Sequence, residues 1–260
     1  MAGYQFALLG DPVEHSRSPE IHRVLFELSG LEGDYQTVRA DRAALRAAVS
    51  DLRSGVWDGL NVTMPLKREA AGIADILSPQ AERSGSVNTL VRALLGVEGH
   101  STDSTTFLEL VADERFGGID GPVFVLGAGG SCAAVLAALA QGRRVYLAAR
   151  KRAQAEEMAR RFGAEVVSWG AAVADSLVIN TTPIGMRGEM LPDGVIEVAA
   201  GLIDLPYGTE TTPAIETARR LARPAADGHE FLTRQAMASF ALWTGTEVAF
   251  DRLWATLRKV

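Results

Sequence analysis

The chain has 260 residues, of which 47% are hydrophobic and 22% are charged, and its formal net charge is −6. These values are typical of a globular protein with one or two domains, and the acidic balance argues against nucleic acid as a partner. The single cysteine, Cys132, excludes an internal disulfide and a site built from several thiolates.

The first hundred residues alternate between strand and helix patterns, which implies a largely parallel sheet. Ser18 and Asp41 are predicted helix N-caps, and Pro19 and Pro65 are predicted first helical positions. We expect strands over residues 4–10, 34–40 and 57–63, helices over 19–28, 42–53 and 65–77, and a strand or hairpin arm over 86–94.

A second alternating unit begins near residue 121 with "PVFVL", a run apolar enough for a strand buried on both faces. Residues 230–257 are apolar at helical spacing and predict two helices broken near Gly245. We also expect strands over 122–126, 143–149, 165–169, 175–182 and 201–207, helices over 131–142 and 152–163, and a weak boundary within 102–121.

The apolar stretches are too short for a membrane protein. The N-terminal segment lacks a basic region and is expected to be a strand rather than a signal peptide. The run "CAAVLAALA" is far shorter than a membrane-spanning helix requires. We therefore expect a cytoplasmic protein that does not associate with a membrane.

The segment "LNVTMPLKREA", residues 60–70, places a lysine where helix geometry does not favour one. Lys67 falls in the first turn of the predicted helix, and the partial positive charge of a helix N-terminus favours acidic side chains there. Because such local mismatches mark functional sites, Lys67 is a candidate functional residue.

The segment "VFVLGAGGSCAAVLAAL" predicts a dinucleotide-binding turn between a strand and a helix. Gly127 permits the tight turn, and Gly129 and Gly130 let backbone amides approach a pyrophosphate at the helix N-terminus. Ala128 and Ser131 complete this loop, while Cys132 and Ala133 are the small residues at the third position of the pattern.

The end of the next strand favours NADP over NAD. An NAD site places an acidic residue there for the ribose 2′-hydroxyl, but no acid occurs before Glu156. Arg150, Lys151 and Arg152 occur instead, and arginine binds a 2′-phosphate bidentately. The alternative interpretation is a solvated basic turn that begins a helix.

Two common dehydrogenase chemistries lack their residues. One cysteine and four scattered histidines argue against a catalytic zinc site, so no metal is expected. A Tyr-x-x-x-Lys pair is absent from the sequence. Lys67 is therefore the acid/base candidate, with Asp103 as its carboxylate partner, although Asp103 alone fits a helix N-cap better.

Several other polar residues have both a functional and a structural interpretation. Ser16 and Ser18 fit a loop and a cap, Asn88 fits a turn, and Gln235 fits a solvated helix position. Together with one lysine and one aspartate, these hydroxyls and amides would suit a polyhydroxylated small acid.

In order and spacing, the motifs resemble those of the shikimate dehydrogenase family over nearly the whole chain. The segments that carry the resemblance are "GDPVEHSRSPEIH", "NVTMPLK", "GSVNTL", "STD", "GAGGS", "NTTPIGM", "DLPYGTETTP" and "GHEFLTRQAMASFALWTG". The resemblance implies reversible NADPH-dependent reduction of 3-dehydroshikimate to shikimate, a step of aromatic amino-acid biosynthesis, by a monomer or homodimer.

The resemblance also implies roles for individual residues. Lys67 and Asp103 would be the catalytic pair. Asp103 would also hold the substrate, together with Ser16, Ser18, Thr63, Asn88, Tyr207 and Gln235. The cofactor would contact the glycine loop, the basic cluster and Thr182, Leu205 and Gly228.

The family fold has two α/β domains. It implies an N-terminal substrate domain over residues 1–103, completed by the C-terminal helices of 231–260, and a Rossmann-like NADP domain over 104–230.

The chain departs from the family pattern at a few positions. Ser101 stands where the family usually has Asn, Phe231 where it has Met, and Ala149-Arg150-Lys151 where it has Asn-Arg-Thr. Ser104 and Thr106 replace glycines. Rival interpretations are a quinate/shikimate or aminoshikimate dehydrogenase and a non-catalytic NADP-binding regulator.

Overall fold

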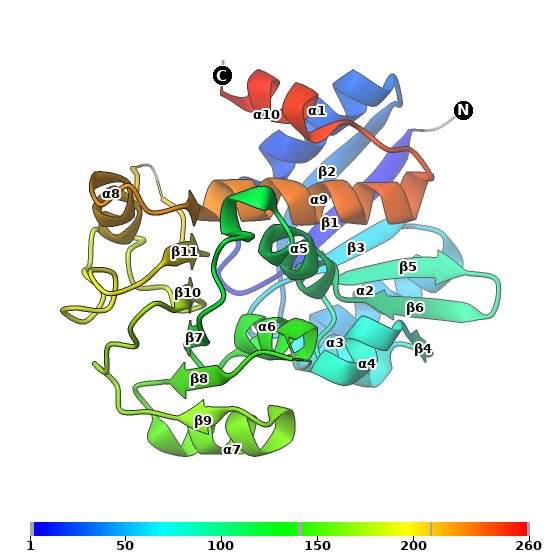
Figure 1. Cartoon of the computed structure of the whole chain (residues 1–260). Coiled ribbons are helices and arrows are strands. Elements are labelled where there is room, and N and C mark those ends of the chain that lie inside the picture. Colours follow the sequence, from blue (N-terminus) through cyan, green and yellow to red (C-terminus); the bar gives the residue numbers. More distant parts are fainter. Residues whose placement is uncertain (1–2, 140–141, 209, 259–260) are drawn as a thin grey trace. The chain divides into compact units, whose positions relative to one another are not determined.

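The computed structural model describes residues 3–139, 142–208 and 210–258, and the chain divides into two compact units (Figure 1). Unit 1 comprises residues 1–106 and 232–260, and unit 2 comprises residues 107–231. The assignment of substrate to the first and of NADP to the second stays a prediction.

Unit 1 contains a six-stranded sheet in the order β2-β1-β3-β5-β6-β4. Its strands are β1 (Tyr4–Gly10), β2 (Gly33–Arg39), β3 (Gly59–Val62), β4 (Ile76–Leu77), β5 (Thr89–Ala93) and β6 (Gly96–His100).

The unit 1 sheet is mostly parallel, as predicted, since β4 also pairs parallel with β6, but it includes antiparallel pairings that were not predicted. β1 pairs parallel with β2 and β3, whereas β5 pairs antiparallel with β3 and β6. The two residues between β5 and β6 can join only antiparallel strands, because a parallel crossover needs a dozen residues or more. The hairpin arm expected over 86–94 is confirmed as β5.

Side chains of β1 alternate between the two faces of this sheet. Ala7 and Leu9 pack with α2 (Arg42–Ser54), α3 (Lys67–Ile73) and α4 (Pro79–Ser84) on one face. Phe6 and Leu8 pack on the other face with α1 (Ser18–Ser29), α10 (Phe250–Leu257) and the part of α9 (Gly228–Thr244) that belongs to unit 1. The break predicted near Gly245 separates α9 from α10, and Gly245 has a φ of +68°.

Unit 2 contains a wholly parallel six-stranded sheet in the order β12-β11-β10-β7-β8-β9. Its strands are β7 (Val123–Leu126), β8 (Val145–Ala148), β9 (Glu165–Val166), β10 (Leu177–Asn180), β11 (Gly201–Asp204) and β12 (Ala225–Ala226). From β7 the chain builds outward through β8 and β9 and then returns to the other side, which is the Rossmann order.

Helices cover both faces of the unit 2 sheet. α6 (Gly130–Leu139), α7 (Arg152–Phe162) and the last turns of α5 (Thr102–Val111) pack on Val123 and Val125. α8 (Pro213–Arg220) packs on Phe124 and Leu126. The predicted α/β class with a Rossmann-like part is confirmed. The helix expected over 131–142 includes residues 140 and 141, which lie outside the described residues.

Two helix starts differ from the predictions. α1 begins at Ser18, with Arg17 at the cap position, so Ser18 is not the N-cap. α3 begins at Lys67 rather than at Pro65, because the Leu66 N–H donates to the Thr63 carbonyl and closes a separate turn. α3 also ends at Ile73, four residues earlier than predicted, before the short strand β4.

Two short helices and one helical turn were not predicted from the sequence. α4 and α8 both begin with a hydroxyl cap followed by proline, Ser78–Pro79 and Thr212–Pro213. This sequence signal was available, since proline is favoured directly after an N-cap. The 3₁₀ helix η1 (Glu114–Phe116) follows α5. Among the described residues, no helix is both long and apolar enough to cross a bilayer.

Asp41 offers a test of the local helix signals. Its carboxylate accepts the Ala44 N–H at 2.9 Å, and the residue is extended, as an N-cap requires. We expect Asp41→Ala to lower the free energy of unfolding by about 1 kcal/mol. Asp41→Asn keeps an acceptor and should stay close to the wild type in urea denaturation. Equal losses in both variants would contradict this cap assignment.

Candidate functional site

The predicted substrate residues of unit 1 gather at one edge of its sheet. Leu9 near the end of β1 pairs with Val62 at the end of β3, so the loops that follow both strands start side by side. Thr89 at the start of β5 pairs with Asn61 of β3 and with His100 at the end of β6. The register therefore brings together the segments that carry Ser16, Ser18, Thr63, Lys67, Asn88 and Asp103.

Lys67 and Asp103 form a direct ion pair at this edge. The Lys67 Nζ donates to Asp103 Oδ2 at 2.6 Å, and the two side chains are only 15% and 6% exposed. Lys67 is the first residue of α3, and Asp103 lies in the first turn of α5. The N-cap interpretation of Asp103 is wrong, because its carboxylate points to Lys67 and Ser101 supplies the hydroxyl that accepts the Ser104 N–H at 3.4 Å.

Asn88 holds the second carboxylate oxygen of Asp103. Its Nδ2 donates to Asp103 Oδ1 at 3.1 Å and to Thr102 Oγ1 at 2.7 Å. Its Oδ1 accepts the Thr102 N–H at 2.8 Å. Asn88 is 4% exposed, so its side chain belongs to a buried network rather than to a solvated turn.

Gln235 of α9 reaches the same network and is not solvated. It is 7% exposed, its Oε1 accepts from Asn88 Nδ2 at 3.3 Å, and its Nε2 donates to the Leu232 carbonyl at 2.9 Å. The C-terminal helix thus contributes to the polar cluster formed by the first hundred residues.

Thr63 sits where the chain leaves β3, held against the end of β1. The Thr63 N–H donates to the Leu9 carbonyl at 2.8 Å. A Cβ on Gly10 would lie 2.3 Å from the Thr63 methyl carbon and 2.9 Å from the Met64 carbonyl oxygen. Gly10 therefore permits the close approach that fixes Thr63.

Ser16 and Ser18 are joined to each other. The Ser16 hydroxyl donates to the Ser18 hydroxyl at 3.1 Å and accepts the Ser18 N–H at 3.2 Å. Ser18 is buried, whereas Ser16 is half-buried. Tyr207, the remaining predicted substrate residue, belongs to unit 2, where its ring lies 5.4 Å from that of His229.

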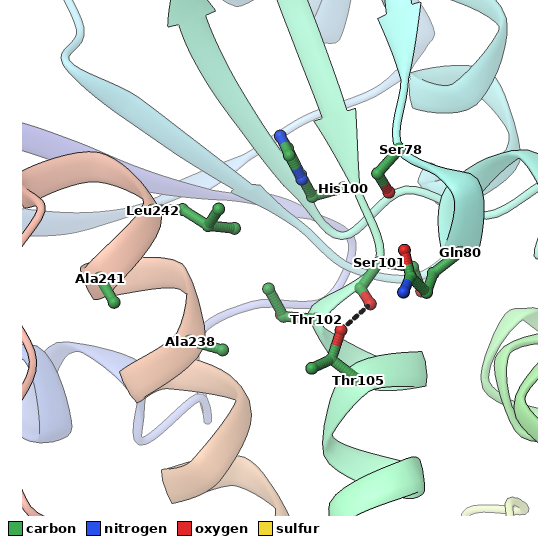
Figure 2. A pocket seen from close by; sticks show the side chains of 9 residues that line it. All are labelled: Ser78, Gln80, His100, Ser101, Thr102, Thr105, Ala238, Ala241 and Leu242. Atoms are coloured by element: carbon green, nitrogen blue, oxygen red, sulfur yellow. Dashed lines mark hydrogen bonds between the residues drawn. The ribbon is translucent and has the colours of Figure 1, made fainter.

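A pocket of unit 1 lies between α4, α5, α9 and the end of β6 (Figure 2). Its walls include His100, Ser101, Thr105 and Leu242. Of the predicted catalytic and substrate residues, none lines this pocket. Thr102, which neighbours Asp103, does line it.

The predicted cofactor residues of unit 2 follow the carboxyl ends of adjacent strands. Leu126 of β7 is in register with Asn180 of β10 and with Ala148 of β8. The glycine loop, Thr182 and Arg150 therefore emerge at one edge, at the point where the strand order reverses. This is where doubly wound sheets bind dinucleotides.

The glycine loop has the geometry that a phosphate-binding turn needs. Gly127 has a φ of +120°, and a Cβ there would lie 2.3 Å from Thr181 Oγ1. A Cβ on Gly129 would meet only open space, and α6 begins at the next residue, Gly130. Ala128 completes the turn and Ser131 lies in the first turn of α6, whose unpaired backbone N–H groups favour an anion.

The basic cluster after β8 is exposed at the same edge. Arg152 begins α7 and pairs with Glu156 at 2.8 Å. Within the described part of the chain, Arg150 and Lys151 form no ion pair, so their charges are available to a phosphate. The residues present thus fit a dinucleotide with a 2′-phosphate.

Thr182, Leu205 and Gly228 come together behind this edge. The Thr182 hydroxyl and N–H both donate to Asn180 Oδ1, and the Leu205 N–H donates to the Asn180 carbonyl. A Cβ on Gly228 would lie 2.3 Å from the Leu205 carbonyl oxygen, so only glycine fits.

Asn180 and Asp204, which were not predicted as functional residues, organise these loops. Asn180 Nδ2 donates to Asp204 Oδ1 at 2.7 Å, and the Thr212 hydroxyl donates to the other oxygen of Asp204. Burial raises the pKa of Asp204 from 3.8 to about 6, against the opposing effect of these two hydrogen bonds. The sequence did contain a signal for these two residues: the apolar strands "LVIN" and "GLID" each end in a polar residue.

Ser101, Ser104 and Phe231, which depart from the expected motifs, make structural contacts. Ser101 Oγ lies 2.9 Å from Ser104 Oγ, so these two residues pair at the start of α5. Phe231 packs on Phe107 with ring centroids 4.7 Å apart. Thr106 is fully buried, and its hydroxyl has no hydrogen-bond partner among the described residues.

Comparisons with known proteins agree along nearly the whole chain. A family model described as the shikimate dehydrogenase substrate binding domain matches residues 8–90. A shikimate dehydrogenase (NADP(+)) from Acidiphilium cryptum is 37% identical over 256 residues, which cover 95% of this chain and 93% of that protein. One from Alkalilimnicola ehrlichii is 36% identical over 267 residues and covers 98% of each.

A solved structure is similar in fold as well as in sequence. Shikimate 5-dehydrogenase from Thermus thermophilus, in complex with NADP(H) and shikimate, has a TM-score of 0.86 to this chain and is 32% identical. The match covers 98% of this chain and 99% of that one, so it includes the residues of both units.

The buried Asp204 predicts a pH dependence of stability. The folded chain binds this proton more tightly than the unfolded chain, so the stability it contributes is present below pH 3.8 and lost as the pH rises through about 6. Relative to Asp204→Asn, the wild-type free energy of unfolding should fall by about 2 kcal/mol between pH 4 and pH 7. Urea denaturation at several pH values measures this difference, and parallel stability curves would contradict it.

Proposed function

The chain belongs to the shikimate dehydrogenase family, and on that premise we propose that it reduces 3-dehydroshikimate reversibly to shikimate with NADPH through Lys67 and Asp103. The observation that carries the proposal is the 2.6 Å contact between Lys67 Nζ and Asp103 Oδ2 at the sheet edge of unit 1. A shielded ammonium beside a carboxylate is suited to transfer a proton while it stays oriented.

Lys67 supplies the proton in the direction of reduction. When bound, the reduced nicotinamide supplies a hydride to the substrate carbonyl carbon. The Lys67 ammonium then donates a proton to the oxygen that becomes a hydroxyl, and it takes that proton back when the reaction runs in reverse. Its position at the start of α3 fixes its backbone, because the Lys67 carbonyl accepts the Val87 N–H at 3.0 Å.

Asp103 orients Lys67 and binds a substrate hydroxyl. One carboxylate oxygen accepts from Lys67 and the other from Asn88, so the carboxylate plane is held from both sides. Asn88 and Gln235 offer amide groups, and Thr63, Ser16 and Ser18 offer hydroxyls to the remaining hydroxyls and the carboxylate of the substrate. Tyr207 of unit 2 is assigned to the substrate carboxylate.

Unit 2 binds NADP in this proposal. The loop from Gly127 to Ser131 holds the pyrophosphate, and Arg150, Lys151 and Arg152 hold the 2′-phosphate. Thr182, Leu205 and Gly228 border the nicotinamide half. The support is the common sheet edge, the positive φ of Gly127 and the exposed charges after β8.

We place the enzyme in the cytoplasm, in aromatic amino-acid biosynthesis, as a monomer or homodimer that needs no metal, membrane or nucleic acid. The single cysteine is fully buried, and burial raises the pKa of its thiol to about 12, so we assign it no part in the reaction.

A direct assay tests the proposed substrate. The wild type should reduce 3-dehydroshikimate with NADPH far faster than 3-dehydroquinate, and should oxidise shikimate far faster than quinate with NADP⁺. Comparable rates with the quinate pair would assign the broader quinate/shikimate specificity. NADPH binding without turnover of any of these compounds would favour the regulator.

Lys67→Ala tests the proton-transfer role. We expect turnover to fall by roughly 10²–10⁴-fold, the usual contribution of a general acid or base, while NADPH binding by fluorescence titration is unchanged. Lys67→Met keeps most of the aliphatic stem and should lose as much activity, which separates charge from packing. Near-wild-type turnover in either variant would remove Lys67 from the mechanism.

Arg150→Ala tests the cofactor preference. Loss of a charge-assisted contact to a 2′-phosphate should raise the KM for NADP⁺ by about 10- to 100-fold and leave the KM for NAD⁺ unchanged. Arg144→Ala is the matched control, because Arg144 is also exposed but directly precedes β8 and pairs with Glu165 at 2.9 Å. An unchanged KM for NADP⁺ would favour the alternative of a solvated basic turn.

A further inference from the structure

Three buried hydroxyls lie directly behind the Asn88 side chain in unit 1. They belong to Thr89 of β5, Thr102 of α5 and Ser239 of α9, and we call them the hydroxyl cluster. All three residues are at most 2% exposed. Thr89 Oγ1 lies 2.8 Å from Ser239 Oγ, and Thr102 Oγ1 lies 3.3 Å from each of the other two. Burying a hydroxyl costs free energy unless it is hydrogen-bonded, so we ask what function this cluster serves.

The cluster borders an amide whose orientation is fixed by the backbone. Asn88 Oδ1 accepts the Thr102 N–H at 2.8 Å, and a backbone N–H can only donate. The other end of the Asn88 amide is therefore its nitrogen, which faces Thr102 Oγ1 at 2.7 Å, Asp103 Oδ1 at 3.1 Å and Gln235 Oε1 at 3.3 Å. Asp103 thus meets an N–H group rather than a carbonyl oxygen.

The direction of each hydroxyl follows from this orientation. Thr102 Oγ1 accepts from Asn88, so its own hydrogen points to Thr89 or Ser239. At the far end, Ser239 Oγ lies 3.0 Å from the Gln235 carbonyl, which can only accept. Donation running from Asn88 through Thr102, Thr89 and Ser239 to that carbonyl lets every hydroxyl donate once and accept at least once.

Asn61 holds the cluster from the side of β3. Its Nδ2 lies 3.1 Å from both Thr89 Oγ1 and Ser239 Oγ, and its Oδ1 accepts the Tyr35 hydroxyl at 2.8 Å. The network therefore joins β2, β3, β5, α5 and α9 within unit 1. Fully satisfied buried networks of this kind hold side chains rigidly.

We infer that the hydroxyl cluster is a positioning element of the reaction, an inference that rests on the proposed function. Thr102 accepts one amide hydrogen of Asn88 and leaves the other for Asp103 Oδ1, which at 3.1 Å is nearer than the alternative acceptor, Gln235 Oε1, at 3.3 Å. With that oxygen held, Asp103 Oδ2 stays aimed at Lys67 Nζ. Thr102 acts through Asn88 and is a positioning residue, as are Thr89 and Ser239.

Paired substitutions at Thr102 test this inference. Thr102→Val keeps the shape but removes the hydroxyl, and we expect kcat/KM for shikimate to fall by about 10-fold while the KM for NADP⁺ is unchanged. Thr102→Ser keeps the hydroxyl and should retain most of the activity. Ser176→Ala is the stability control, because it removes a buried hydroxyl of unit 2 that donates only to the Val173 carbonyl at 2.7 Å.

A double-mutant cycle with Asn88→Ala separates positioning from general destabilisation. If Thr102 acts through Asn88, Thr102→Val should cost nothing further once Asn88 is alanine. An equal loss in both backgrounds would overturn the inference. If the melting temperature of Thr102→Val is well below that of Ser176→Ala, the cycle is repeated with Ser239→Ala. That variant removes the hydroxyl at the other end of the hydroxyl cluster.

The outcomes for the two proposals are distinguishable. Wild-type protein that oxidises no shikimate would overturn the proposed function, and this inference with it. Wild-type turnover that Thr102→Val and Ser239→Ala leave unchanged would overturn the inference alone.

Discussion

The ion pair between Lys67 and Asp103 is the contact on which the site depends. Its partners lie 36 residues apart in sequence and are largely shielded from water. A shielded charge that loses its partner costs about 3–5 kcal/mol, so the surrounding chain must hold both groups in place. Asn88 does this for the carboxylate, and the start of α3 does it for the lysine.

Sheet register places the rest of the machinery. In unit 1 the ends of β1, β3 and β6 and the start of β5 meet at one edge, so distant polar residues become neighbours. In unit 2 the parallel register of β8, β7, β10 and β11 does the same for the cofactor residues. In both units the buried apolar strands form a rigid scaffold, and most of the predicted functional residues lie in or near the loops that follow the strands.

Much of this arrangement could be predicted from the sequence, because the signals were local. Asp41 and Gly245 were recognised from capping and break rules, and the glycine loop from its place between strand and helix. The start of α3 was predicted two residues early, because the proline rule does not account for the turn that Leu66 closes on Thr63. The partners of Asn88, Thr102 and Ser239 could not be predicted, because they depend on tertiary packing between segments up to 178 residues apart.

The most direct test of this account is a crystal structure of the protein with shikimate and NADP⁺ bound. The account predicts that the hydroxyl whose carbon faces the nicotinamide lies within hydrogen-bond distance of both Lys67 Nζ and the Asp103 carboxylate. Shikimate bound elsewhere, for example in the pocket beside His100 and Leu242, with the Lys67–Asp103 pair out of its reach, would contradict the account.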